Sequence, residues 1–106
     1  MSINALTDQF HSSLASLMEQ FVQEKQACGY RYRAGRQELA RFDRFLTGEA
    51  LPQSALPGSI TRKWLAKKPH ECAGTQQHRI TIVRQFARYM CRLGYPADVP
   101  DWSLAA

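Results

Sequence analysis

Apolar residues recur at helical spacing along this chain, and no segment shows the alternation typical of a half-buried β-strand. In the first such segment they are separated by three or four residues, which places them on one side of a helix: Leu14, Leu17, Met18, Phe21 and Val22. This pattern predicts an amphipathic helix over residues 13–28. Gly29 is expected to end it, because glycine readily adopts the left-handed conformation that follows many helices.

Two further helices are predicted in the middle of the chain. Residues 33–47 place several apolar side chains on one face, and no Ser, Thr, Asp or Asn stands directly before them as an N-cap. Residues 49–58 contain Pro52, Pro57 and Gly58, which favour turns, so we expect a loop there. Ser59 is an expected N-cap for a short helix over residues 60–68.

The longest helix is predicted over residues 76–93, with Thr75 as N-cap and Gly94 as the residue that ends it. Residues 1–12 are weakly periodic and are expected to form a leader. The residues after Gly94 include two prolines and two aspartates, which favours an extended linker over residues 96–106. The predicted fold class is all-α, a four-helix domain over residues 13–95 with short loops.

The largest apolar residue on the inner face of each helix is expected to enter one core: Phe21, Phe42, Trp64 and Phe86. Cys91 is expected to pack there as a small apolar side chain. No apolar run approaches the ~18–20 residues that a membrane span needs, so we expect a soluble, cytoplasmic protein without a membrane partner. Three widely separated cysteines do not suggest a disulfide framework.

Charge is the strongest indication of function. The 106 residues carry a formal net charge of +5, with 14 Lys and Arg against 9 Asp and Glu. Ten of the fourteen cations are arginine, whose rigid fork suits phosphate oxygens and guanine edges. Nine of these arginines fall within residues 29–48 and 75–93, and the second of these segments contains no acidic residue. A polyanionic partner would balance such a charge.

Two predicted helices each carry a face of Arg and Gln, the side chains that read guanine and adenine in the DNA major groove. In the second helix this face comprises Arg33, Gln37, Arg41 and Arg44, with Arg31 just before it. In the fourth helix the candidates are Thr75, Gln77, His78, Arg79, Thr81, Arg84, Arg88 and Arg92. We expect the N-terminal half of that helix to contact bases, and Arg88 and Arg92 to contact the phosphate backbone.

These residues also have other interpretations. A basic helical face is often only a solvated surface, and Tyr30, Tyr32 and Tyr89 are more often packing residues than base-stacking ones. His70, Cys72 and His78 do not match the spacing of a closed zinc site. No catalytic motif occurs, so we expect neither a cofactor nor a metal, and no catalytic residue.

Three blocks of the sequence resemble the N-terminal core-binding domain of tyrosine recombinases of the phage-integrase family. They are EQFVQEKQACGYRYRAGRQELARFDRFL, ITRKWLAKKP and TQQHRITIVRQFARYMCRLGYPADVP. The most specific part runs from Thr75 through Arg79 and on to the closing Leu93-Gly94-Tyr95-Pro96. The resemblance covers roughly residues 14–100, nearly the whole chain.

The resemblance implies a SAM-like four-helix domain that binds double-stranded DNA at a recombination site, alongside other recombinase protomers. In this family the catalytic Arg, Lys, His-x-x-Arg and nucleophilic Tyr lie in a second domain that follows the linker. No His-x-x-Arg occurs here. The chain is therefore expected to position a recombinase or integrase on DNA without catalysing cleavage itself. Where the family commonly has Ser or Thr near the start of the second helix, this chain has Arg33-Ala34-Gly35, so Arg31 or Arg33 would have to supply the phosphate contact.

Two alternatives remain from other functional classes. SAM-like helical domains also act as protein-interaction or oligomerisation modules, which would need no DNA. A helix-turn-helix regulator is disfavoured, because the ten-residue loop predicted over 49–58 exceeds the three or four residues that this motif allows between its helices.

Overall fold

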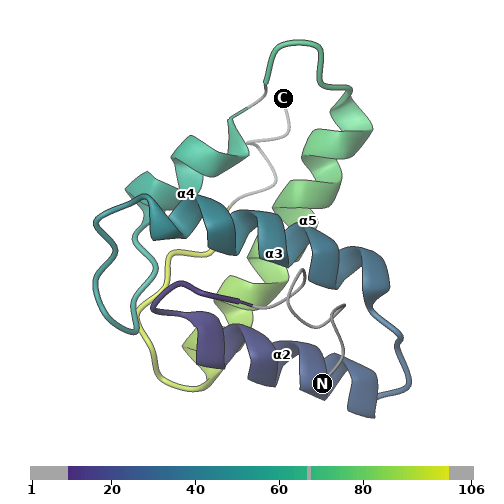
Figure 1. Cartoon of the computed structure of the whole chain (residues 1–106), viewed down its shortest axis with the longest axis vertical. Helices are drawn as coiled ribbons and strands as arrows, with labels where there is room; N and C mark the ends of the chain where they lie inside the picture. The colour runs from purple at the N-terminus through teal and green to yellow at the C-terminus, as the bar shows by residue number, and fades with distance from the viewer. Residues whose placement is uncertain (1–9, 67, 101–106) are drawn as a thin grey trace. The chain divides into compact units, whose positions relative to one another are not determined.

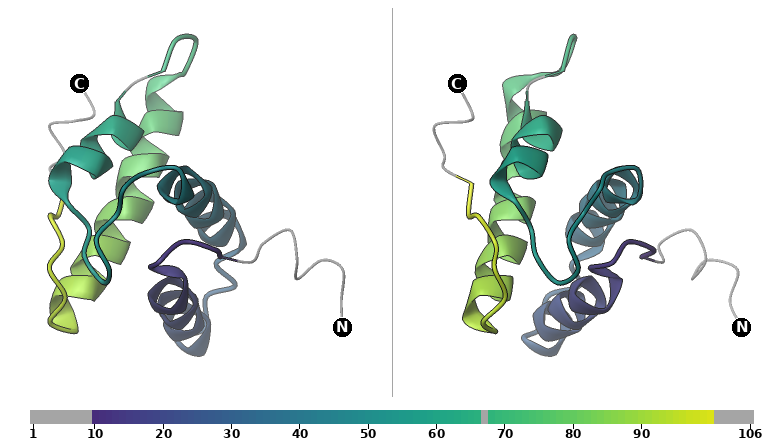
Figure 2. Two further views of the ribbon diagram at one scale, coloured as in Figure 1. Left: turned by 60° about the vertical axis from the view of Figure 1, so that its left-hand side comes forward. Right: turned by 90° about the vertical axis from the view of Figure 1, so that its left-hand side faces the viewer.

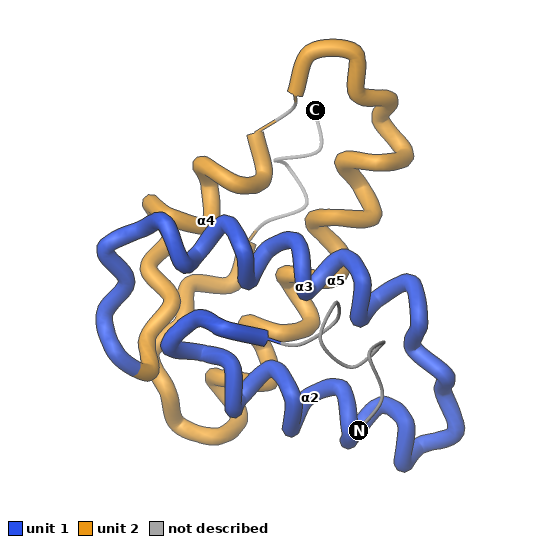
Figure 3. Tube along the Cα trace, viewed as in Figure 1, with its two compact units in different colours: residues 1–53 blue, residues 54–106 orange. Residues whose placement is uncertain are grey.

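The computed structural model describes residues 10–66 and 68–100, which contain four helices and no strand (Figure 1). The helices are α2 (Ala15–Ala27), α3 (Arg33–Thr47), α4 (Gly58–Leu65) and α5 (Ala73–Arg92). The predicted all-α class is confirmed for this part of the chain. The chain divides into two compact units, residues 1–53 and 54–106, so the division falls inside the expected 13–95 domain (Figure 3).

In the first unit, α2 and α3 form an antiparallel helical hairpin (Figure 1). All five residues of the predicted apolar stripe are buried, from Leu14 to Val22. Gly29 follows α2 with a φ of 97°, as its predicted role in ending the helix requires. The guanidinium of Arg36 on α3 donates to both carboxylate oxygens of Glu19 on α2, at 3.2 and 3.0 Å, and so joins the two helices.

The start of α3 depends on an aromatic side chain. Its N-cap is Tyr32, which lies in the left-handed region at a φ of 58° and makes no side-chain cap hydrogen bond. The Tyr32 ring packs edge-on against Phe21, with 5.6 Å between ring centroids. A Cβ at Gly35 would lie 2.5 Å from this ring. Glycine at this position therefore allows the ring to cover the first turn, and α3 begins at residue 33 as predicted.

The chain just before α2 is bound to α3. The backbone N–H groups of His11 and Ser12 donate to the two carboxylate oxygens of Asp43, at 2.7 and 2.8 Å, and Asp43 is only 1% exposed. Phe10 is also buried. The end of the expected leader is therefore part of the first unit, whereas residues 1–9 lie outside the described residues.

In the second unit, α4 spans 58–65 instead of the predicted 60–68, and its N-cap is Pro57 instead of Ser59. The helix ends early because side chains of α5 bind its last carbonyl groups. Arg79 donates to the carbonyl oxygens of Trp64 and Ala66, and Gln76 donates to that of Leu65 at 3.2 Å. These donors replace the amide groups that a longer helix would have supplied.

The helix α5 begins three residues earlier than predicted. Its N-cap is Cys72, whose carbonyl oxygen accepts from the N–H groups of Thr75 and Gln76, so Thr75 lies inside the first turn. At its other end α5 stops at Arg92, one residue before the predicted 93. Gly94 follows with a φ of 93°, as expected for the residue that ends a helix.

The first part of the expected linker, residues 96–100, is attached to the second unit. It returns alongside α5 towards the start of α4 (Figure 2). There Leu56 donates to the carbonyl of Pro96 at 2.9 Å, and Asp98 donates to the carbonyl of Leu56 at 3.0 Å. Pro100 is buried. Backbone pairing thus attaches residues 96–100 of the expected linker to the second unit; residues 101–106 lie outside the described residues.

The four aromatic residues expected in the core are all buried, with at most 9% of any one exposed: Phe21, Phe42, Trp64 and Phe86. The expectation that Cys91 packs in the core is wrong, because Cys91 is exposed and its thiol donates to the carbonyl of Ala97 at 3.3 Å. Within the described residues, no helix is both long enough and apolar enough to cross a membrane.

Candidate nucleic-acid interface

Charge separates the two units. Residues 1–53 contain six Lys and Arg and six Asp and Glu, so the first unit is formally neutral. Residues 54–106 contain eight cations and three acids, which accounts for the entire net charge of +5. The second unit is therefore the strongly cationic part of the chain, and it contains α5.

Three arginines follow one another along α5 at four-residue spacing, Arg84, Arg88 and Arg92. Arg88 and Arg92 are exposed. The guanidinium of Arg92 lies over the ring of Tyr89, 5.2 Å from its centroid. Helix α5 has no acidic residue among its twenty. Like charges at this spacing repel along a helix, and phosphate groups bound along it would relieve that repulsion.

Two of the residues expected to contact bases already make contacts within the protein. The Arg84 side chain is half-buried and its Nη1 donates to the carbonyl of Pro100 at 2.6 Å. The Thr81 hydroxyl donates to the carbonyl of Gln77, one turn back along the helix, at 2.9 Å. Gln77 and His78 are exposed. The N-terminal half of α5 therefore presents fewer available polar side chains than the sequence suggested.

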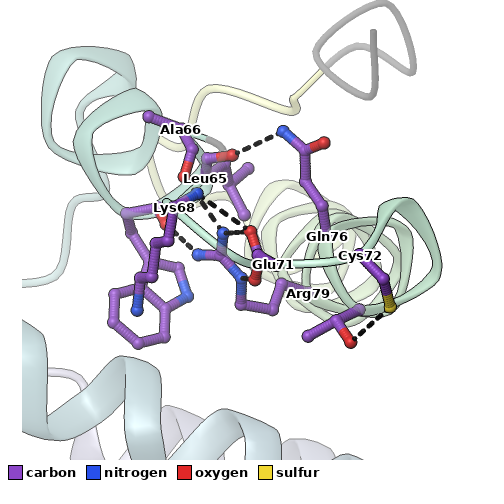
Figure 4. A network of polar contacts seen from close by, with 9 residues as sticks. Leu65, Ala66, Lys68, Glu71, Cys72, Gln76 and Arg79 are labelled. Atoms are coloured by element: carbon purple, nitrogen blue, oxygen red, sulfur yellow. Dashed lines mark hydrogen bonds and ion pairs between the residues drawn. The ribbon is translucent and has the colours of Figure 1, made fainter.

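The structure corrects the prediction for Arg79. This residue is 3% exposed and belongs to the interior of the second unit, so its prediction as a DNA contact is wrong. Figure 4 shows its guanidinium between the end of α4 and the Glu71 carboxylate, which accepts from it at 2.9 and 2.8 Å. This contact lowers the pKa of Glu71, chiefly through the hydrogen bonds from Arg79. The sequence held a signal for this burial, because Arg79 is in helical phase with Val83 and Phe86 of the apolar stripe.

The first turn of α5 carries an exposed thiol. The Cys72 Sγ and the Thr75 Oγ1 lie 3.1 Å apart, and this hydrogen bond is the main reason that the pKa of Cys72 is lowered. Thr75 is exposed, as expected for a DNA contact, but its hydroxyl is shared with the thiol. A thiolate near the positive end of a helix is also favoured by the helix dipole.

In the first unit, the predicted arginine face of α3 is exposed. All of its members lie on the surface, and so does Arg31: Arg33, Gln37, Arg41 and Arg44. Arg41 makes a 3.4 Å ion pair with Glu38, whose other oxygen is buried without a hydrogen-bond partner. Arg41 is therefore partly neutralised, and α3 presents a weaker positive surface than its arginine count indicates.

Sequence patterns missed several exposed cations of the second unit, because these do not stand at one helical spacing. Arg62 and Lys63 lie on α4, and Lys68 lies after it with its Nζ 4.4 Å from the centroid of the Trp64 ring. These residues extend the positive surface of the second unit beyond α5.

Other candidate sites are not assembled. Within residues 10–66 and 68–100, no group of three or more His, Cys, Asp or Glu side chains is placed to hold a metal ion. Tyr30 is exposed, whereas Tyr32 is half-buried, and desolvation raises the pKa of Tyr32 to about 12. Tyr89 is half-buried beneath Arg92.

Comparison of the chain with models of known protein families, with curated proteins and with solved structures finds no match.

Proposed function

We propose that this chain is a double-stranded DNA-binding module of a site-specific tyrosine recombinase or integrase, which positions the protein on a recombination site. The observation that carries the proposal is the arginine series on α5, a helix with no acidic residue, in the unit that holds all of the net charge. Phosphate contacts would supply most of the affinity, and exposed Gln and Arg side chains would supply sequence preference. The sequence resemblance described above supplies the recombinase assignment.

The test is fluorescence anisotropy with a labelled duplex over a range of NaCl concentrations. With ~4–6 phosphates neutralised, log K should fall with log salt at a slope of about −4 to −5. Affinity that does not change between low and physiological salt would contradict electrostatic binding. We also expect no covalent protein–DNA product on denaturing gels, because the family's nucleophilic Tyr belongs to a different domain.

Variants that each remove one positive charge distinguish DNA binding by the α5 surface from a general electrostatic attraction to the chain. Arg88→Gln and Arg92→Ala should each weaken binding about equally on all sequences and reduce the salt slope by about one unit. The control is Lys25→Gln on α2, which removes one positive charge from the neutral first unit. Gln77→Ala should instead cost about 1–3 kcal/mol on a site selected from a random library, and much less on random DNA.

The alternative is a helical protein-interaction module, and one observation favours it. Just after α5, two large apolar side chains lie on the surface two positions apart, Leu93 at 46% and Tyr95 at 36% exposed. Concentration-dependent self-association that is insensitive to salt and lost in Leu93→Ser, together with no DNA binding, would favour this function over ours.

A further inference from the structure

The segment that follows α5 presents oxygen atoms to two arginines of the second unit. The Asp98 Oδ2 lies 3.7 Å from the Nη1 of Arg62 on α4. Two residues later, the Pro100 carbonyl oxygen accepts from Arg84 on α5 at 2.6 Å. Two residues of extended chain span at most ~7 Å, so Asp98 and Pro100 lie within that distance of each other along the backbone. One short segment therefore supplies an anionic and a neutral oxygen to arginines from two helices.

Asp98 is one of few acidic residues in the described part of the second unit. Among its described residues, 54–66 and 68–100, only two acidic residues occur, Glu71 and Asp98. Glu71 is used in the buried pair with Arg79. The Asp98 side chain is 60% exposed, and it is the one carboxylate on the described surface of a strongly cationic unit. It lies against an arginine.

The surroundings of Asp98 suit an anion. A Cβ at Gly58, the first residue of α4, would collide with the Asp98 carboxylate, so the absence of a side chain there leaves space for it. The same Cβ position lies 3.1 Å from the Arg62 Nη1. The positive end of a helix adds to the attraction for a negative group. Gly58, Arg62 and the N-terminal end of α4 therefore surround the Asp98 carboxylate.

This ion pair is of the kind that a stronger ligand displaces. Both side chains are about 60% exposed, and exposed ion pairs contribute little free energy. A DNA phosphate in the same place would gain from the other cations of the unit, because a polyanion binds several of them together. Arg62 can therefore exchange its internal partner for an external one at small cost.

We propose that Arg62 and Arg84 bind phosphates of the nucleic-acid backbone, and that the chain's own segment 96–100 supplies their partners in the absence of DNA. Asp98 stands in the place of the phosphate and competes with it. The inference rests on the proposed function for its ligand, and it adds two features: a contact at Arg62, and an internal competitor that lowers affinity for DNA.

The test is a double-variant cycle measured by anisotropy with one labelled duplex at low salt. Asp98→Asn should raise affinity about 2–5-fold, the factor expected when an exposed ion pair is removed. Arg62→Gln should lower affinity and abolish most of the gain from Asp98→Asn. In an Arg88→Gln background the gain should persist, because the ion pair of Asp98 is with Arg62. Glu24→Gln in the first unit controls for the change in net charge alone.

The outcomes distinguish this inference from the proposed function. Suppose that the protein binds DNA, but that Asp98→Asn raises affinity no more than Glu24→Gln does, or raises it equally with and without Arg62. The proposed competition by Asp98 is then wrong, and the proposed DNA binding stands. If the protein binds no DNA, the proposed function fails, and titration with inorganic phosphate decides the site. Phosphate-dependent shifts in the NMR signals of Arg62 and Asp98, with the Asp98 shift lost in Arg62→Gln, would support the phosphate site. No such shifts in the native chain would overturn it.

Discussion

Arg79 and Glu71, eight residues apart in the sequence, form a buried ion pair in which the guanidinium donates to both carboxylate oxygens. The same guanidinium donates to the carbonyl groups of Trp64 and Ala66 at the end of α4. The Glu71 carboxylate also accepts from the backbone N–H of Lys68 at 3.1 Å. One arginine thus connects the end of α4, the loop that follows and α5.

The first prediction concerns the stability of this pair. Arg79→Gln or Glu71→Gln should each lower the free energy of unfolding by about 3–5 kcal/mol, because either change leaves a buried charge without its partner. The double variant should lose less than the sum of the two single losses. Urea unfolding measures all three. Arg62→Gln, which breaks an exposed pair, is the control and should cost at most ~1 kcal/mol.

The second prediction concerns acid. Because Arg79 lowers the pKa of Glu71 in the folded state, Glu71 contributes stability that is fully present above its unfolded pKa of ~4.3 and is lost as the pH falls through the lower folded pKa. The difference in unfolding free energy between native chain and Glu71→Gln should therefore shrink steadily below about pH 4. A difference that stays constant down to pH 2 would show that the charge of Glu71 does not matter.

The third prediction concerns the core. Phe42 and Phe86 are both fully buried, one in each unit. Truncating either to Ala should cost about 3–5 kcal/mol, the sum of lost burial and the cavity that remains. Thermal melting followed by circular dichroism measures the loss. A variant that melts like the parent would mean that the side chain has little packing around it.

The fourth prediction concerns Gly35 and the Tyr32 ring. Gly35→Ala should cost about 1–3 kcal/mol, because a Cβ 2.5 Å from the ring forces the ring or the helix to shift. In the native chain, absorbance titration should show one of the four tyrosines ionising last, at about pH 12. In Gly35→Ala that last step should move towards pH 10, as the ring becomes more exposed. Titration of Tyr32→Phe identifies the step.

The fifth prediction concerns thiol reactivity. All three cysteines are exposed, and the pKa of Cys72 is lowered by its hydrogen bond with Thr75. Iodoacetamide near neutral pH should therefore modify Cys72 before Cys28, because the thiolate is the reacting form. Thr75→Val should slow the reaction at Cys72 alone. Mass spectrometry of peptides after brief labelling gives the order, and equal rates at Cys72 and Cys28 would contradict the prediction.

Local patterns in the sequence determined the helices well. Residues 33–47 form α3 with the predicted bounds, and the glycines at 29 and 94 end their helices in left-handed conformations. The apolar stripe from Leu14 to Val22 is buried as expected. These features depend on spacing along one helix and on the conformational freedom of single residues. Both are properties of a short stretch of chain, so the sequence contains them directly.

Tertiary structure decided which arginines have partners within the protein. The helical phase of Arg79 indicates the face on which it lies, but not the groups that accept from its guanidinium, because those groups come from other parts of the chain. Arg79 is buried because Glu71 and the end of α4 supply acceptors for its guanidinium, and Arg84 is half-buried because Pro100 returns to it. Arg62 showed no pattern of its own, yet it forms an ion pair with Asp98, which is thirty-six positions away. The sequence determined how much positive charge the chain carries, and folding determined where that charge is available, because burial and pairing of a charged side chain depend on groups that only the tertiary structure brings together.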